Sequence, residues 1–356
     1  MRQLILIFVL SIILNSVNSQ GMHVSGNKLL DGNGNVFVFR GINIAHAWYK
    51  DKTQFSLDEI NALNANSARI VLACGAQWEK TSYSELQQII SWCENDGLIC
   101  VLELHDFTGS NNPSDITSTA LNYWNEMKDL LNQHKNYIII NIANEWLGGW
   151  NQGDTYRDTY VSAVSSMRAM GIENAIMVDA SGYGQETWPI VENAQRILEA
   201  DPNRNVIFSY HVYSVLGKDE GSLFSSFDAL KNTGVCWIVG EVGWYHSGQV
   251  VAYKSLMDYC KNNQIGWIAW SWSGNGGDDA PLDLTSVNTF SRNDLTNWGK
   301  EVFYMENGIV NTSKKAYNGG SYDYCQGCEV TAIGEDGRKW GWENEKSCLI
   351  DTNKCG

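Results

Sequence analysis

The feature that most constrains the fold is an eightfold alternation of short apolar runs with longer helical patterns. The runs are five to seven residues long and rich in β-branched and aromatic residues, as expected of strands buried on both faces of a parallel sheet. The predicted strands are Phe37–Ile42, Ala68–Ala73, Leu98–Leu104, Tyr137–Ile142, Ala175–Asp179, Val206–Tyr210, Trp237–Glu241 and Gly266–Trp270.

Segments with helical periodicity separate these strands. They are Leu57–Asn64, Tyr83–Asn95, Thr119–Asn132, Thr155–Met170, Trp188–Ala200, Leu223–Asn232 and Val250–Asn263, with a last helix expected within Thr285–Asn297. Eight strand–helix units over roughly 290 residues predict an α/β fold, a (β/α)8 TIM barrel. A doubly wound open sheet is disfavoured because no glycine-rich phosphate-binding fingerprint follows an early strand. Turn signals within 22–39 predict an N-terminal hairpin below the barrel.

Charge and aromatic content narrow the class of ligand. The net charge of −15 argues against nucleic acid or an anionic membrane as a partner. An acidic enzyme suits a neutral substrate. Fifteen Trp and sixteen Tyr supply flat rings that can stack on sugars, although most of them are expected in the core.

Residues 1–19 have the pattern of a secretory signal peptide. Arg2 gives a positive start, Leu4–Leu14 an apolar stretch, and Val17–Ser19 a small-residue cleavage site. The stretch is too short for a spanning helix, and no later segment approaches the required length. We therefore expect a secreted, extracellular protein in which disulfides are permitted.

The nine cysteines divide unevenly, with five before residue 300 and four within Cys325–Cys355. At least one is expected to be unpaired, and the sequence does not specify the connectivity. The barrel domain is expected over 20–310, followed by a polar, glycine-bearing linker at 311–323 that contains the glycosylation sequon Asn311-Thr312-Ser313. Residues 324–356 are too few to fold without cross-links and predict a disulfide-rich module.

Polar residues gather where the predicted strands end. Glu145 follows the fourth strand within Asn144-Glu145, and Glu241 closes the seventh. Burying a carboxylate at the end of a strand costs free energy, so such a residue is expected to have a function. In a barrel, the carboxyl ends of the strands carry the catalytic groups. Two such carboxylates are what acid/base cleavage of a glycosidic bond requires. Arg69 lies within the second strand, whereas His105, His211, Tyr213 and Trp270 lie at the ends of the third, sixth and eighth strands.

This set of residues, in this order, resembles glycoside hydrolase family 5, and in particular its bacterial-type endo-β-1,4-mannanases. The resemblance runs from about Gly21 to Ile309. It is carried by Arg40-Gly41-Ile42-Asn43, Ala45-His46-Ala47-Trp48-Tyr49-Lys50, Arg69-Ile70-Val71-Leu72-Ala73, Leu102-Glu103-Leu104-His105-Asp106, Asn141-Ile142-Ala143-Asn144-Glu145-Trp146 and Ala269-Trp270-Ser271-Trp272-Ser273-Gly274-Asn275.

The resemblance implies cofactor-free, retaining hydrolysis of mannan, with Glu145 as acid/base and Glu241 as nucleophile. Retention predicts carboxyl groups about 5 to 5.5 Å apart. The remaining expected substrate-binding residues are Arg69, His105, Asn144, His211, Tyr213, Trp270, Trp146, Trp244 and Trp48.

Alternatives remain open at this point. Val242-Gly243-Trp244-Tyr245-His246 puts large aromatics where mannanases usually have a smaller Gly-Gln pair, which leaves an endo-β-1,4-glucanase as the nearest rival. A non-catalytic carbohydrate-binding barrel is disfavoured because a binder needs no pair of glutamates. No zinc-ligand spacing accompanies His105 and His211, and no G-x-S-x-G elbow indicates a serine hydrolase.

The C-terminal residues resemble the cysteine-rich dockerins of anaerobic-fungal cellulosomes, which are related to carbohydrate-binding module family 10. The string Asp336-Gly337-Arg338-Lys339-Trp340-Gly341-Trp342-Glu343-Asn344 is its most specific part. Ser347 departs from the pattern, because an aromatic residue usually precedes the cysteine. The resemblance implies a scaffoldin partner; a polysaccharide-binding module and a simple disulfide knot are the alternatives.

Overall fold

The computed structural model describes residues 21–316, 325–333, 339–343, 346–350 and 355. The signal peptide predicted at 1–19 lies outside the described residues. None of the helices in the described part of the chain is long and apolar enough to cross a membrane.

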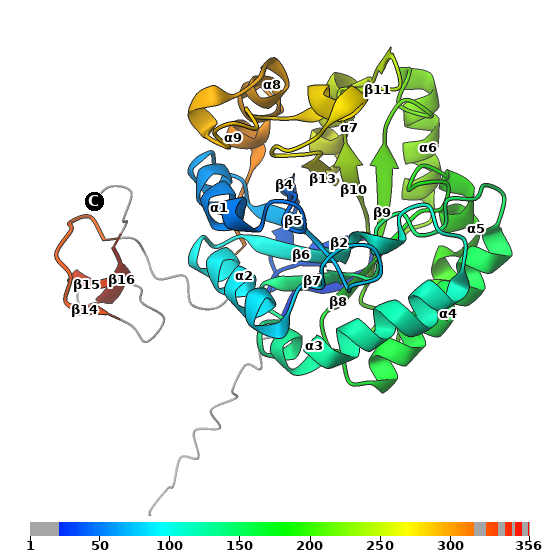
Figure 1. Cartoon of the computed structure of the whole chain (residues 1–356), viewed down its shortest axis with the longest axis horizontal. Helices are drawn as coiled ribbons and strands as arrows, with labels where there is room; N and C mark the ends of the chain where they lie inside the picture. Colours follow the sequence, from blue (N-terminus) through cyan, green and yellow to red (C-terminus); the bar gives the residue numbers. More distant parts are fainter. Residues whose placement is uncertain (1–20, 317–324, 334–338, 344–345, 351–354, 356) are drawn as a thin grey trace, which may run out of the picture.

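Eight parallel strands close into a barrel, with neighbours in the order β4–β5–β6–β7–β8–β9–β10–β13 and β13 pairing back onto β4 (Figure 1). The strands are β4 Arg40–Ile44, β5 Ser67–Leu72, β6 Ile99–Leu104, β7 Ile138–Asn141, β8 Ala175–Asp179, β9 Val206–Val212, β10 Trp237–Val242 and β13 Gly266–Ala269. Every residue of these strands is buried, which agrees with their near-continuous apolar character. The predicted (β/α)8 barrel is confirmed.

Helices surround the strands (Figure 1). They are α1 Thr53–Ala62, α2 Tyr83–Asn95, α3 Leu121–Gln133, α4 Gly153–Ala169, α5 Thr187–Glu199, α6 Glu220–Asn232, α7 Tyr253–Asn263 and α8 Asn297–Tyr304. The predicted bounds of α2 are confirmed, since Ser82 and Glu85 form a capping box at its start. The side chain of Asp219 similarly caps α6 by accepting a hydrogen bond from the Ser222 amide.

The N-terminal prediction was incomplete, because three strands form below the barrel where a two-stranded hairpin was expected. They are β1 His23–Ser25, β2 Lys28–Leu30 and β3 Val36–Phe37. Phe37 pairs with Leu29 of β2 and packs with Phe39 beneath the barrel. The first barrel strand therefore begins at Arg40 and not at Phe37.

The last helix was misplaced by the prediction of Thr285–Asn297. The helix α8 begins at Asn297 because the Thr296 hydroxyl caps it by accepting a hydrogen bond from the Gly299 amide. The preceding segment instead bridges Thr285 to Leu295 and includes a short 3-10 turn, Arg292–Asp294.

The first residues of the expected linker pack on the barrel. Ile309–Thr312 form a short helix, α9, and the Thr312 hydroxyl accepts a hydrogen bond from Arg40 Nε at 3.0 Å. The Lys315 ammonium donates to Asn61 Oδ1 at 2.8 Å and to the Ala65 carbonyl at 2.6 Å. The catalytic unit therefore extends to about residue 316, because polar side chains hold a segment that has no apolar pattern. Residues 317–323 lie outside the described range.

The C-terminal residues that are described form a separate three-stranded antiparallel sheet. Its strands are β14 Ala332–Ile333, β15 Lys339–Glu343 and β16 Lys346–Leu349. Disulfides join Cys325 to Cys348 and Cys328 to Cys355. The five other cysteines, all in the barrel, are free thiols, which confirms that pairing is incomplete: Cys74, Cys93, Cys100, Cys236 and Cys260.

Two truncations test where the catalytic unit ends. A chain that ends after Asn318 should keep the barrel's melting temperature, whereas one that ends after Val310 should lose about 1–3 kcal/mol, because Arg40 and Asn66 lose partners at Thr312 and Lys314. Calorimetry should show a drop of about 2–4 °C per kcal/mol. Equal melting of the two chains would mean that residues 311–316 contribute nothing.

Candidate active site

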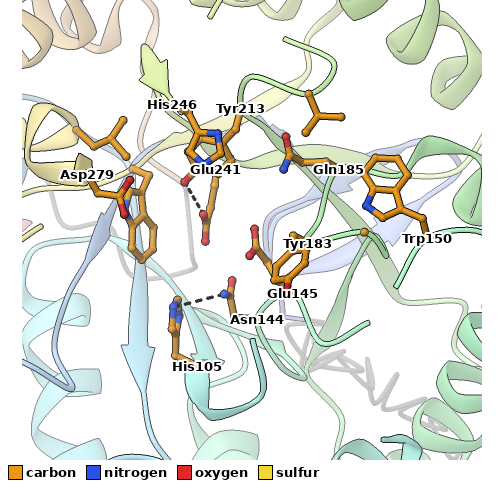
Figure 2. A pocket seen from close by; sticks show the side chains of 14 residues that line it. His105, Asn144, Glu145, Trp150, Tyr183, Gln185, Tyr213, Glu241, His246 and Asp279 are labelled. Atoms are coloured by element: carbon orange, nitrogen blue, oxygen red, sulfur yellow. Dashed lines mark hydrogen bonds between the residues drawn. The ribbon is translucent and has the colours of Figure 1, made fainter. Parts of the chain in front are cut away.

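The two glutamates singled out from the sequence meet above the carboxyl ends of the strands. Glu145 lies four residues after the end of β7, and Glu241 lies within β10. Figure 2 shows both carboxyl groups pointing into one cleft. A carboxylate oxygen of each lies within 4.8 Å of the other and of a His211 ring nitrogen. This spacing agrees with the short carboxyl separation of retaining glycosidases.

Arg69 is the fully buried cation of the site. Its Nη1 lies 2.8 Å from Glu241 Oε1, and its Nη2 lies 2.7 Å from Asn144 Oδ1 and 3.3 Å from Asp179 Oδ2. Glu103 lies 3.7 Å away. These carboxylates raise the pKa of Arg69 against the opposing effect of burial. Arg69 is therefore a charged hub that orients other groups and does not reach the cleft.

Tyr213 adds a neutral donor to Glu241. Its hydroxyl lies 2.7 Å from Glu241 Oε2, so each oxygen of this carboxylate accepts a separate hydrogen bond, one from Arg69 and one from Tyr213. Burial, followed by the charge of Glu241, holds the pKa of Tyr213 well above its ordinary value. The phenol consequently stays protonated and donates to Glu241, so this carboxylate accepts one hydrogen bond from a cation and one from a neutral group.

Glu145 has the opposite surroundings. Burial, and then the nearby charges of Glu241 and Asp179, raise its pKa well above the ordinary value. The backbone of Glu145 is left-handed, with φ of 44°, and its amide donates to Asp179 Oδ2 at 3.0 Å. Left-handed backbone in a side-chain-bearing residue is uncommon and occurs at functional sites where surrounding contacts enforce it.

His211 lies beneath the cleft. It is completely buried, and its Nδ1 is 2.7 Å from Glu145 Oε1 and 3.6 Å from Glu241 Oε2. Burial lowers the pKa of His211 to about 3, so the ring is neutral at ordinary pH. We expected His211 to hold substrate, but in this position it contacts the glutamates instead.

The cleft itself has a volume of about 380 Å³. The residues that line it are His105, Asn144, Glu145, Trp150, Gly182, Tyr183, Gln185, Tyr213, Val215, Glu241, His246, Trp270, Asp279 and Leu282, most of them labelled in Figure 2. Trp270 stacks against the His105 ring, with centroids 5.6 Å apart. Asn144 is held by Arg69 and by the Thr108 hydroxyl, which accepts from its Nδ2 at 2.9 Å.

The three other predicted tryptophans have different positions. Trp146 does not reach the cleft: it is fully buried, and its indole nitrogen donates to the Asn112 carbonyl. Trp244 packs behind the cleft and donates to the Pro281 carbonyl at 2.6 Å. Trp48 is partly exposed, with its ring centroid 5.1 Å from that of His105 at the edge of the site.

Several residues of the site were missed from the sequence. Asp179 ends β8 as Glu145 follows β7, so the same rule of strand ends would have found it. Trp150, Tyr183 and Gln185 lie on loops, where no periodicity indicates which side chains turn inward. His246 belongs to the segment that departs from the mannanase pattern, and Ser214 holds its Nδ1 at 2.9 Å.

Two groups of side chains have the spacing of metal ligands among the described residues. One is Glu145, His211 and Glu241, but the Arg69 guanidinium at 2.8 Å already supplies a positive charge to Glu241 and would repel a cation. The other includes Cys325 and Cys348, whose sulfurs are joined in a disulfide.

The family model described as cellulase, glycosyl hydrolase family 5, matches residues 30–276. The chain belongs to glycosyl hydrolase family 5. A second model, described as a cellulose or protein binding domain, matches residues 314–350. The second match agrees with the predicted relation to carbohydrate-binding modules; it does not separate docking from sugar binding.

Among curated family 5 relatives, a mannan endo-1,4-beta-mannosidase of Cellvibrio japonicus is 37% identical, over 94% of this chain and 80% of that protein. One of Salipaludibacillus agaradhaerens is 38% identical, over 83% of this chain and 94% of that protein. The catalytic domain of the mannanase from Streptomyces sp. SirexAA-E superposes with a TM-score of 0.79 at 34% identity, covering 89% of this chain and 99% of that structure.

Replacing Arg69 tests its role as the hub of the site. Arg69→Met should destabilise the protein by about 3–5 kcal/mol at neutral pH, because it leaves buried carboxylates without their cation. The loss should shrink as the pH falls, because protonation removes the uncompensated negative charges. Denaturant unfolding measures both effects. The control, Arg157→Met, breaks ion pairs with Asp154 and Asp158 at the surface and should leave stability unchanged. A loss independent of pH would contradict the electrostatic role.

Proposed function

We propose that this protein is a retaining endo-β-1,4-mannanase in which Glu145 is the acid/base and Glu241 the nucleophile. The observation that carries the proposal is the asymmetry of two adjacent carboxyl groups. Glu241 accepts hydrogen bonds from Arg69 and Tyr213, whereas burial and like charges raise the pKa of Glu145. One carboxyl is thus prepared to attack and the other to donate a proton.

In the first step, an ionised oxygen of Glu241 attacks the anomeric carbon and forms a glycosyl ester. The bond to the glycosidic oxygen breaks, and the Glu145 proton passes to that oxygen as the leaving chain departs. In the second step, Glu145, now ionised, takes a proton from water as the water oxygen attacks the same carbon. Glu241 is released as a carboxylate, and the configuration is retained.

The side chains beside the two glutamates can contact the sugar ring at which the reaction takes place. Asn144, fixed by Arg69 and Thr108, is placed beside Glu145 to donate to the sugar 2-hydroxyl, a contact that strengthens in the oxocarbenium-like transition state. The stacked Trp270 and His105 form an apolar floor beneath the ring. No cofactor enters this scheme.

Mannan is the substrate favoured over glucan. The relatives and the structure with more than 30% identity described above carry mannosidase or mannanase names. An endo-β-1,4-glucanase remains the alternative because the segment 242–246, which supplies His246 to the cleft, departs from the mannanase pattern.

Substrate preference and roles can be tested together. The wild type should release reducing ends from mannan much faster than from carboxymethylcellulose. Glu145→Ala should lower kcat on mannan by about 10²–10⁴-fold, because the leaving oxygen receives no proton. With an aryl mannobioside whose leaving group needs no proton, added azide should restore turnover and give a β-glycosyl azide. Glu241→Ala should not be rescued in that way. Activity confined to carboxymethylcellulose would support the glucanase.

The pH dependence tests the electrostatic origin of the acid. Glu145 must be protonated to donate, so kcat/KM falls as pH rises through its raised pKa. Asp179 contributes to that rise, hence Asp179→Asn should lower the pKa of Glu145 and move the alkaline limb to lower pH. Asp201→Asn, which removes a buried carboxylate paired with Arg168 elsewhere, should leave the limb in place. An unmoved limb in Asp179→Asn would exclude this contribution.

We also propose that the protein is exported. The residue pattern of 1–19 supports this, and so do the two disulfides of the C-terminal module, which need an oxidising compartment to persist.

For the C-terminal module we propose docking to a scaffold protein of a cellulosome. Trp342 on β15 is 62% exposed, whereas Gly341 faces inward, where an added Cβ would meet the Cys325 sulfur. Ser347 lies opposite Trp342 in the sheet, so this position offers no second ring for a sugar platform. The exposed aliphatic side chains Val330 and Ile333 suit a protein surface better than a sugar. We expect Tyr324, Trp340 and Trp342 to anchor the partner together; Trp340 is half-buried, and Tyr324 lies outside the described residues.

Removal of the module separates docking from sugar binding. A chain ending after Asn318 should hydrolyse soluble mannan like the full chain but lose binding to a purified scaffold protein from the same secretome. Trp342→Ala in the full chain should reproduce the loss of binding, as expected for an aromatic anchor. Retention of the full chain on insoluble cellulose or mannan, with no binding to scaffold, would favour the carbohydrate-binding alternative.

A further inference from the structure

A second cleft of about 440 Å³ lies beside the active-site cleft. One wall comes from the loop after β7, through Trp150 and Asn151. The others come from the start of α5, through Thr187 and Trp188, and from the first turns of α6, through Ser222 and Ser225. It therefore opens at the same end of the barrel as the catalytic groups.

Trp150 joins the two clefts, because it lines both. Its ring is 42% exposed and packs over Gly182, where an added Cβ would meet the indole at 2.8 Å. Gly182 has φ of 60°, so the tight approach rests on a backbone conformation that favours glycine. The indole is thus held as a partition with solvent access from both sides.

Trp188 is the second ring of this cleft, and its side chain is 63% exposed, more than that of any other described tryptophan. An indole left so exposed does not contribute the free energy of burial that its large apolar surface could provide. Trp188 is the second residue of α5. Glu186, which directly precedes this helix, accepts hydrogen bonds from the Asn151 amide and the Ser181 hydroxyl, both at 2.8 Å. These contacts hold in place the backbone that carries the Trp188 ring.

The polar groups of this cleft that are free to bind a ligand are uncharged. Glu186 is buried and already accepts two hydrogen bonds, whereas Ser225 of α6 is exposed. Two partly exposed indoles, together with the exposed Ser225 hydroxyl, match the apolar faces and hydroxyl edges of a sugar chain. A charged ligand would find no free partner of opposite sign among the residues that line the cleft.

We propose that this cleft binds the leaving-group side of a mannan chain, beyond the sugars held in the active-site cleft. The inference rests on the proposed function. Glu145 must face the oxygen of the leaving chain, and Figure 2 shows Tyr183, Gln185 and Trp150 on the Glu145 side of the cleft. A chain leaving on that side passes Trp150 and meets Trp188. The cleft would thereby favour long polymers over short oligosaccharides.

The test uses the full chain and two substrates. Trp188→Ala should lower the ratio of kcat/KM on linear mannan to that on mannotetraose by about three- to tenfold, the range expected for loss of one stacking ring. Ser225→Arg, which fills the opposite wall, should lower the ratio in the same direction. Tyr304→Ala removes a ring that is 55% exposed on α8, away from both clefts, and should leave the ratio unchanged.

Binding without turnover separates this proposal from the proposed function. In a Glu145→Ala background, Trp188→Ala should reduce retardation in a gel containing soluble mannan, and the Tyr304→Ala control should not. Wild-type cleavage of mannan with an unchanged ratio and unchanged retardation in Trp188→Ala would overturn the second cleft alone. An equal loss on mannotetraose and polymer would also overturn it, because Trp188 would then belong to the active-site cleft. Absence of mannan cleavage by the wild type would instead overturn the proposed function.

Discussion

The ionic contact between Arg69 and the buried carboxylates is the interaction on which the rest of the site depends. Glu103, Asp179 and Glu241 all lie within 3.7 Å of a guanidinium that has no access to solvent. Desolvating so many charges is tolerated only when the charges are closely paired and additional hydrogen bonds support them. Asn141 and Asn43 supply further acceptors to the same guanidinium. The strands of the barrel thus act as a rigid frame around one cation.

The same contact gives the two glutamates different surroundings. Glu241 accepts a hydrogen bond from Arg69. The carboxyl group of Glu145 interacts with Arg69 only by longer-range electrostatics and lies closer to His211. His211 is neutral, so it gives Glu145 a polar neighbour without a positive charge that would favour ionisation. Asp179 adds a negative charge and also holds the Glu145 amide. Asp179 therefore affects both the position and the pKa of Glu145.

Sequence reasoning was most successful where burial imposes a pattern. The eight strands are buried throughout, so their apolar runs and the polar residues at their ends could be predicted, and Glu145, Glu241 and Arg69 meet as expected. The prediction failed where a single polar contact determines where an element begins or ends. The Thr296 cap sets the start of α8, and the Lys315 side chain holds a segment that has no apolar pattern against the barrel. Trp146 and His211 show the same limit, because a position near a strand end does not specify whether the side chain turns into the cleft or beneath it.

The segment after Glu241 shows how a change in one wall of the cleft can leave the contacts of the two glutamates intact. Trp244, which was expected to contact substrate, is drawn away by its hydrogen bond to the Pro281 carbonyl and packs against the cluster that contains Tyr213 and Leu282. His246 enters the cleft in its place, with Ser214 fixing its ring. Neither residue contacts Arg69, and Tyr213 still donates to Glu241. The departure from the mannanase pattern therefore alters one wall of the cleft, while the hydrogen bonds to Glu241 come from Arg69 on β5 and from Tyr213 directly after β9, both outside that segment.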